Sequence, residues 1–151
     1  MVVIQNGTDY CPVDESGFAS TLQTVLEDLH HGNSELLIRL VDLAEIQQLN
    51  KVYRHQDKPT NVLSFAVDLP IEIDEAILGD VVICTEQVHE EAKAQHKTFE
   101  HHLIHLAVHG VLHCLGYEHT ESHAAEAMES LEIKILHKLG IANPFTISGP
   151  D

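Results

Sequence analysis

Positively charged residues are scarce in this chain of 151 residues, which contains 8 lysines and arginines but 24 aspartates and glutamates. Its formal net charge of −16, counted with neutral histidines, gives a surface that repels polyanions and anionic membranes at long range. We therefore expect neither DNA nor a membrane as a partner. Binding of any other polyanion would have to depend on a local basic site or on a carrier.

The chain also lacks paired cysteines and long apolar segments. Its three cysteines, Cys11, Cys84 and Cys114, contain no CxxC pair, which argues against a disulfide framework and favours a reducing compartment such as the cytoplasm. The longest apolar runs, such as Val81–Cys84, are far shorter than a membrane span. A charged segment followed by a long apolar one is missing from the first residues, so we expect no secretory signal.

No repeat, low-complexity tract or flexible linker divides the sequence, and one domain over residues 1–151 is expected. Hydrophobic periodicity predicts strands near residues 2–5, 35–41, 61–67 and 78–84. It predicts helices near residues 15–30, 43–53, 86–96, 99–115 and 122–139. This pattern is typical of a layered α+β domain with some parallel strand pairs.

Residues that favour helix ends support these boundaries. Thr85 and Thr98 are expected to be N-caps, because threonine side chains accept hydrogen bonds from the first amides of a helix. Gly32-Asn33, Gly116 and Gly140 are expected to end helices, because glycine adopts the left-handed conformation of a helix C-terminus without strain.

Histidine is abundant, with 13 residues, and the spacing of three of them indicates a metal site. On a helix, His109 and His113 lie on one face about 6 Å apart and can direct two imidazoles at one ion. Gly116 lets the chain turn back, which brings His119 round as a third ligand. Three protein nitrogens would leave a fourth position for water, as in a catalytic rather than a structural zinc site.

Other histidines compete for this role. His101, His105, His109 and His113 form a stripe at four-residue spacing. A helix rises about 1.5 Å per residue, so His105 and His113 are about 12 Å apart along the axis and cannot share one ion. Only the pair His109 and His113 adjoins the glycine turn. We expect His105 to support a ligand from behind or to be a core residue with one satisfied ring nitrogen.

Two kinds of metal chemistry are excluded by residues that are missing. A gluzincin-type peptidase has a glutamate directly after its first histidine, and this position is Gly110 here. A nucleobase deaminase requires HxE and PCxxC motifs, and neither occurs. Metal-assisted hydrolysis of another kind remains. The short basic cluster of Lys51, Arg54 and Lys58 points to phosphate, because arginine grips phosphate through two parallel hydrogen bonds.

With these residues identified, the chain resembles the YbeY family of bacterial endoribonucleases. The family signature HGxLHxxGYDH appears as His109–His119, with Glu118 in place of aspartate. The stretch Asn50–Phe65 is similar to the motif NxxYRxxDxPTDVLSF, with Asn61 in place of aspartate, and Leu78–Cys84 is similar to LGD[IVL]xI. These motifs cover roughly residues 45–139 in the family's order and spacing.

The resemblance implies a mixed sheet of about four strands with about five helices, and a metal site on a central helix and the turn after it. It implies zinc bound by His109, His113 and His119, although three histidines also suit nickel or copper. It implies single-strand-specific RNA cleavage that needs Arg54 and His109. The implied partners are ribosomal RNA and the small ribosomal subunit or its assembly factors, in RNA maturation and ribosome quality control.

Three functions remain open from the sequence. The first is this endoribonuclease, with Arg54 holding the phosphate. The second is a non-catalytic ribosome-assembly factor in which the metal only staples the fold. The third is a metal-dependent hydrolase of a small phosphoester or amide. The sequence does not identify a general base, and Asp57, Asp80 and Glu118 are equal candidates for it.

Overall fold

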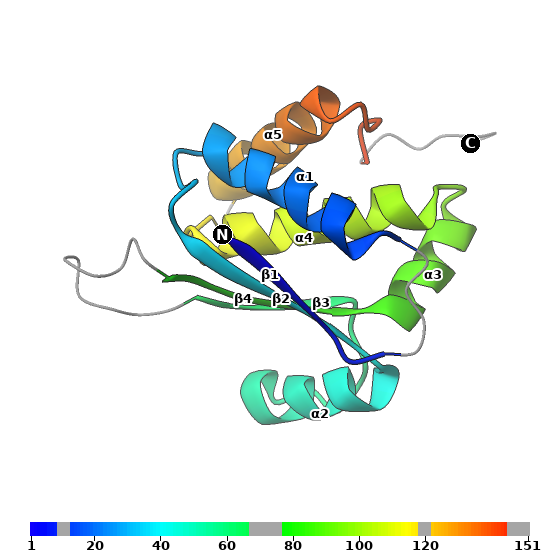
Figure 1. The fold of residues 1–151 in the computed structure, drawn as a ribbon. Coiled ribbons are helices and arrows are strands. Elements are labelled where there is room, and N and C mark those ends of the chain that lie inside the picture. Colours follow the sequence, from blue (N-terminus) through cyan, green and yellow to red (C-terminus); the bar gives the residue numbers. More distant parts are fainter. Residues whose placement is uncertain (9–12, 67–76, 118–121, 145–151) are drawn as a thin grey trace.

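The computed structural model describes residues 1–8, 13–66, 77–117 and 122–144, which contain four strands and five helices (Figure 1). The strands are β1 (Val2–Asn6), β2 (Glu35–Val41), β3 (Val62–Ala66) and β4 (Ile77–Cys84). The helices are α1 (Glu15–Asp28), α2 (Leu43–Arg54), α3 (Thr85–Ala94), α4 (Phe99–Cys114) and α5 (Ser122–Lys138). Among the described residues, no helix has the length and apolarity needed to cross a membrane.

The strands form one mixed sheet in the order β1-β2-β4-β3. β1 pairs with β2 and β2 with β4 in parallel, while β3 and β4 are antiparallel. β2 and β4 are central and contain mostly apolar residues, as strands covered on both faces do. The expected α+β fold with a mixed four-stranded sheet is therefore confirmed, and β3 is left at an edge.

Helices cover the two faces of the sheet unequally (Figure 1). Helices α1, α4 and α5 lie on one face, where the larger apolar core includes Leu36, Ile38, Val81 and Ile83 from the sheet. Helix α2 lies on the other face over a smaller cluster around Ile46 and Val82. Helix α4 packs directly on β3 and β4 and is covered in turn by α1 and α5. It is thus the central helix that the metal-site prediction requires.

The close approach of α4 to the sheet depends on Gly110. A β-carbon added at this position would lie 2.6 Å from Cγ1 of Val81 and 3.1 Å from Oγ of Ser64. The first distance is too short for two carbons that are not bonded to each other, so any other residue would push α4 away from β3 and β4. This explains why no glutamate can follow His109 as it does in the peptidase motif.

The expected helix ends are partly confirmed. The Thr98 side chain accepts from the His101 amide at 3.1 Å, and Gly116 and Gly140 have φ angles of 97° and 79° at the ends of α4 and α5. The predicted cap at Thr85 is wrong. Cys84 occupies the N-cap without a side-chain bond, while Thr85 is buried and its hydroxyl contacts that of Thr8 at 3.3 Å.

The predicted stop of α1 at Gly32-Asn33 is also wrong. The helix ends at Asp28, and His30 takes the left-handed conformation with φ of 65°. The amide of His31 then donates to the carbonyl of Leu26 at 2.8 Å, which closes the helix two residues before the glycine. Histidine enters this region more readily than most residues with a β-carbon.

Candidate active site

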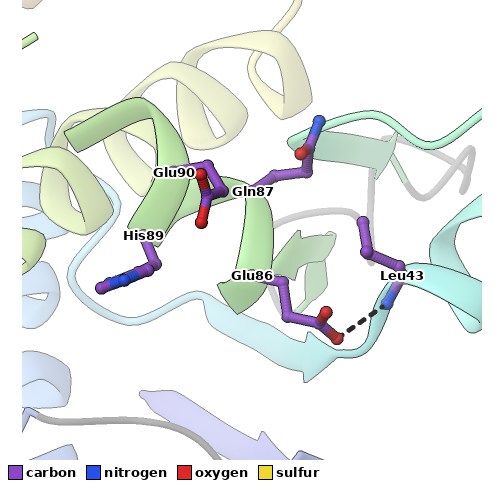
Figure 2. A pocket seen from close by; sticks show the side chains of 5 residues that line it. All are labelled: Leu43, Glu86, Gln87, His89 and Glu90. Carbon is purple, nitrogen blue, oxygen red and sulfur yellow. Dashed lines mark hydrogen bonds between the residues drawn. The ribbon is translucent and has the colours of Figure 1, made fainter. Parts of the chain in front are cut away.

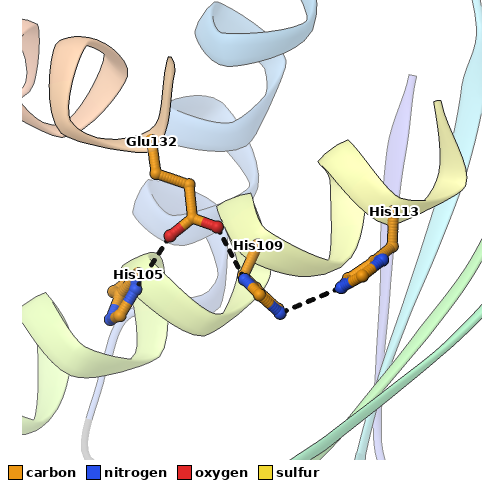
Figure 3. A network of polar contacts seen from close by, with 4 residues as sticks. All are labelled: His105, His109, His113 and Glu132. Atoms are coloured by element: carbon orange, nitrogen blue, oxygen red, sulfur yellow. Dashed lines mark hydrogen bonds and ion pairs between the residues drawn. The ribbon is translucent and has the colours of Figure 1, made fainter. Parts of the chain in front are cut away.

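Two of the three predicted metal ligands meet on α4. His109 and His113 are one turn apart, and their Nε2 atoms are 3.1 Å from each other (Figure 3). The two rings are nearly perpendicular, with an interplanar angle of 77° and a centroid separation of 4.6 Å. Both ring tips are therefore directed to one place beside the helix.

This arrangement fits a zinc-like ion. Two nitrogens bound to one tetrahedral zinc at about 2.0–2.1 Å lie roughly 3.3 Å apart, close to the observed Nε2–Nε2 separation of 3.1 Å. The third predicted ligand, His119, lies outside the described residues, as does Glu118. Within the described part of the chain no three histidine, cysteine or acidic side chains are grouped to hold a metal. The described residues thus supply two nitrogens, and the complete triplet remains a prediction.

A glutamate that the sequence analysis missed supports this site. Glu132 reaches from α5 to α4, where its Oε1 atom accepts from Nδ1 of His109 at 2.6 Å and its Oε2 atom accepts from Nε2 of His105 at 3.2 Å (Figure 3). Its side chain is only 1% exposed. The available signal was its position: Glu132 lies one turn after Met128 and one turn before Ile135 on the face of α5 that was expected to point inward.

Hydrogen bonds, rather than burial, decide the charge of Glu132. Burial alone would raise the pKa of this carboxyl, but the bonds from His105 and His109 outweigh it and hold the pKa at about 2. At His105 burial prevails instead: it lowers the pKa of the ring and outweighs the bond to Glu132, which would raise it. His105 therefore satisfies both expected descriptions, since it is largely buried and also contacts the residue that supports His109.

Arg54 lies at the C-terminal end of α2 and reaches the edge strand β3. Its Nη2 atom donates to the carbonyl oxygen of Ser64 at 3.1 Å, and its guanidinium carbon is 6.0 Å from the centre of the Phe65 ring. The turn after α2 is held by Asn50, whose side-chain amide donates to the carbonyl of Lys58 at 2.9 Å. These contacts place Arg54 beside β3 and tie the turn that contains Lys58 to the end of α2.

A cavity of about 740 Å³ joins these groups. It lies between the end of α2, β3 and the C-terminal half of α4, and it is lined by His109, His113, Arg54 and Lys58 together with neutral residues. None of its described lining residues is acidic. A hollow of about 410 Å³ at the start of α2 and α3 instead contains two carboxylates, Glu86 and Glu90 (Figure 2).

The third basic residue and two candidates for the general base lie elsewhere. Lys51 is 4.0 Å from Asp57, whose carboxylate also accepts from Gln47 at 3.0 Å. Neither Lys51 nor Asp57 is among the residues that line the cavity, and neither is Asp80 on β4. The described residues of the cavity therefore do not identify a general base.

Comparison with known proteins identifies the family of this chain. A family model described as "Endoribonuclease YbeY" matches residues 3–140. A protein of that name from Ruthia magnifica subsp. Calyptogena magnifica is 61% identical over 96% of this chain and 100% of its own length. The chain belongs to the YbeY endoribonuclease family. A second protein of that name, from Vesicomyosocius okutanii subsp. Calyptogena okutanii (strain HA), is 58% identical over the same shares.

A solved structure agrees with this fold. The solution structure of a protein from Thermotoga maritima matches 97% of this chain and 99% of its own with a TM-score of 0.58 and 26% identity. YbeY membership makes the chain a hydrolytic, metal-dependent endonuclease without fixing which metal it uses. The alternatives of a non-catalytic assembly factor and of a small-molecule hydrolase are not favoured.

The substitution of Asn61 for the aspartate of the YbeY motif has a local explanation. The Asn61 amide donates to both carboxylate oxygens of Glu91, at 3.1 and 3.3 Å. Glu91 also accepts from Nε2 of His102 at 2.8 Å. Burial would raise the pKa of Glu91, and these two donors lower it below its usual value. An aspartate here would face another carboxylate. The Asn61 side chain is thus engaged by Glu91, whereas the Arg54 guanidinium is oriented by the carbonyl of Ser64.

Proposed function

We propose that this chain is one domain that cleaves single-stranded RNA in the maturation of small-subunit ribosomal RNA and in ribosome quality control, in the cytoplasm. The observation that supports this most directly is the cavity of about 740 Å³, where two histidines with converging ring tips lie beside Arg54 and Lys58. In a chain of net charge −16, a cavity without acidic residues in its described lining is a place where a phosphodiester can bind.

The metal in this proposal is zinc, with nickel as the alternative, held by His109, His113 and His119. A zinc ion held there would supply Lewis-acid chemistry, because it activates water at neutral pH and stabilises negative charge on phosphate oxygens. His109 is counted as catalytic because it holds the metal within the cavity. Because its Nδ1 faces Glu132, its Nε2 is the ring nitrogen that points toward His113.

Arg54 and Lys58 are proposed to hold the scissile phosphate. One nitrogen of Arg54, Nη2, donates to the carbonyl of Ser64 and anchors the guanidinium at the cavity wall. Its other N–H groups are proposed to donate to phosphate oxygens. A donor fixed in this way stabilises the charge that develops in the transition state without having to reorganise. Lys58 adds a second positive charge from the turn that Asn50 holds.

The strongly acidic remainder of the chain determines how substrate arrives. Two cationic side chains provide only a few phosphate contacts, which is too little for tight binding of naked RNA at physiological salt. We propose that the small ribosomal subunit or one of its assembly factors presents the RNA. Tight and salt-insensitive binding of the isolated chain to naked RNA would contradict this part of the proposal.

The test compares cleavage of ribosomal RNA and of intact ribosomes by zinc-loaded wild type, Arg54→Ala and His109→Ala. Arg54→Ala should lower cleavage at least about 100-fold while metal content stays equal to wild type. His109→Ala should lose both metal and cleavage. Lys51→Ala is the matched control, because Lys51 is on the same helix but pairs with Asp57 and does not line the cavity.

Full activity of Arg54→Ala, or loss of metal in that variant, would contradict the division of roles between arginine and histidines. Turnover of small phosphoesters or amides with no cleavage of RNA would contradict the substrate.

A further inference from the structure

Glu132 is a buried charged residue whose two oxygens are both engaged by histidines of another helix. Its side chain is 1% exposed, and its oxygens contact Nδ1 of His109 and Nε2 of His105 at 2.6 and 3.2 Å (Figure 3). A buried ion pair by itself adds little net stability, because the cost of removing both groups from water offsets their attraction. A purely structural role would therefore be served as well by an apolar residue on the inward face of α5.

The chemistry of the carboxylate determines which nitrogens carry protons. An ionised carboxylate only accepts hydrogen bonds, so each ring nitrogen that faces Glu132 must donate. Nδ1 of His109 therefore carries its proton, and in the neutral ring the lone pair is left on Nε2. That is the nitrogen 3.1 Å from Nε2 of His113, at the place where the two ring tips converge.

His105 provides a second attachment for the same carboxylate. His105 and His109 are one helical turn apart, so their rings lie on one face of α4 and can hold the two oxygens of one glutamate. Bonds to both oxygens fix the plane of the carboxylate and, through it, the rotation of the His109 ring. The other charged or titratable groups that act on His105 are Lys97 and His102, and His102 is itself bonded to Glu91 on α3.

We propose that Glu132 is the positioning residue of the metal site, which selects the Nδ1–H tautomer of His109 and aims its Nε2 lone pair at the metal. The hydrogen bond from His105 to the second carboxylate oxygen holds Glu132 in place. This inference rests on the proposed metal site and adds to it a residue outside the three-histidine motif, contributed by α5. Carboxylates that bond a histidine ligand from behind raise its affinity for metal, and their loss typically weakens binding about 10–100-fold.

The first test measures zinc affinity of the full chain by competition with a chromogenic chelator. Glu132→Gln should bind zinc about 10–100-fold more weakly than wild type, because an amide offers only one acceptor to two ring N–H groups. Glu129→Gln is the matched control, since Glu129 is on the same helix and exposed, and it should bind as wild type does. Equal affinity of Glu132→Gln and wild type would overturn the proposal.

The second test needs no metal and no variant that has to fold. Nitrogen-15 NMR of the His109 ring in the metal-free wild type, at mildly alkaline pH, should show a proton on Nδ1 and a lone pair on Nε2. The reverse tautomer would overturn the proposal. If Glu132→Gln folds, its His109 ring should show a mixture of tautomers, whereas Glu129→Gln should match wild type.

These results separate the inference from the proposed function. Zinc binding that persists in full after His113→Ala would contradict the proposed metal site, whatever the tautomer of His109. Zinc binding that depends on His113 but not on Glu132 would contradict only the positioning role.

Discussion

His102 and His109 of α4 each bond to a glutamate of a neighbouring helix, but they use opposite ring nitrogens. His102 donates from Nε2, the tip of its ring, to Glu91 on α3 at 2.8 Å, and its side chain is 3% exposed. His109 donates from Nδ1, at the base of its ring, to Glu132 on α5 at 2.6 Å, and its side chain is 26% exposed.

This difference separates His102, which joins two helices, from His109, the proposed metal ligand. When the ring tip is bonded to a carboxylate of another helix, as in His102, the imidazole joins two helices and its tip is not directed at the cavity. When the base of the ring is bonded, as in His109, the tip is directed toward Nε2 of His113 and the cavity that both residues line. In the proposed metal site the nitrogen used for the hydrogen bond, rather than the presence of a glutamate partner, sets the proposed ligand His109 apart from His102.

The largest expected effect comes from replacing His102 and His109 each by an amide residue whose nitrogen can keep the hydrogen bond to glutamate. In His109→Asn the side-chain amide lies near the position of Nδ1 and can still donate to Glu132, but Nε2 is gone. We expect zinc binding to be lost and cleavage to fall at least about 100-fold. In His102→Gln the amide lies near the position of Nε2 and can still donate to Glu91, so metal content should equal that of wild type.

The measurement is zinc content of the purified chains together with cleavage of ribosomal RNA. Loss of metal in His102→Gln while the fold is retained would remove the distinction between the two histidines.

A smaller effect is expected at Asn61, the second donor to Glu91. Asn61→Asp would replace two hydrogen bonds of 3.1 and 3.3 Å by a close pair of carboxylates. We expect the free energy of unfolding to fall by about 1–3 kcal/mol at neutral pH, measured by urea denaturation. The loss should shrink as pH falls, because one proton can bridge the two groups. Asn33→Asp, at an exposed position, is the control for the added charge.

The smallest expected effect is a gradual decrease in the stability of the metal-free chain as pH falls. The pKa of Glu132 is lowered to about 2 and that of Glu91 is lowered below its usual value, so the unfolded chain binds more protons than the folded one as pH falls through about 4.5. The stability that these carboxylates contribute is complete above that pH and is lost between it and about 2. The lowered pKa of His105 adds a loss that begins near its ordinary value of 6.5.

Urea denaturation of chelator-treated wild type at a series of pH values measures this dependence. The slope should be shallower in Glu132→Gln and in Glu91→Gln than in wild type. A wild-type stability that rises on acidification would contradict the assignment of charges.

The sequence was sufficient to predict the elements but not the contacts between them. Each strand and helix was predicted because apolar periodicity and glycine positions are local properties, and Gly116 ends α4 as expected. The end of α1 was misplaced because His30 takes the left-handed conformation that was assigned to glycine. His55 and His96 do the same at the ends of α2 and α3, so these histidines serve the backbone rather than an ion.

The candidate site was predictable where its residues share a helix and hidden where they do not. The pairing of His109 with His113 follows from helical spacing, whereas the partnership of His109 with Glu132 joins residues 23 positions apart and depends on how α5 crosses α4. The partnership of Asn61 with Glu91 likewise joins residues 30 positions apart, one just before β3 and the other on α3. The only sequence signal for the partnership of His109 with Glu132 was that Glu132 is a polar residue on an otherwise apolar face of α5.

The lack of a side chain at Gly110 limits which substitutions this site can accept. Val81 and Ser64 lie against the bare backbone of α4, and the carbonyl of Ser64 is also the group that holds Arg54. The spacing between the histidine pair and the arginine is therefore set by a single missing β-carbon. A mutational route from this fold to a peptidase of the HExxH type would have to separate α4 from β3 before the new glutamate could act. That separation would disrupt the spacing between the histidines and Arg54 before a peptidase site could form.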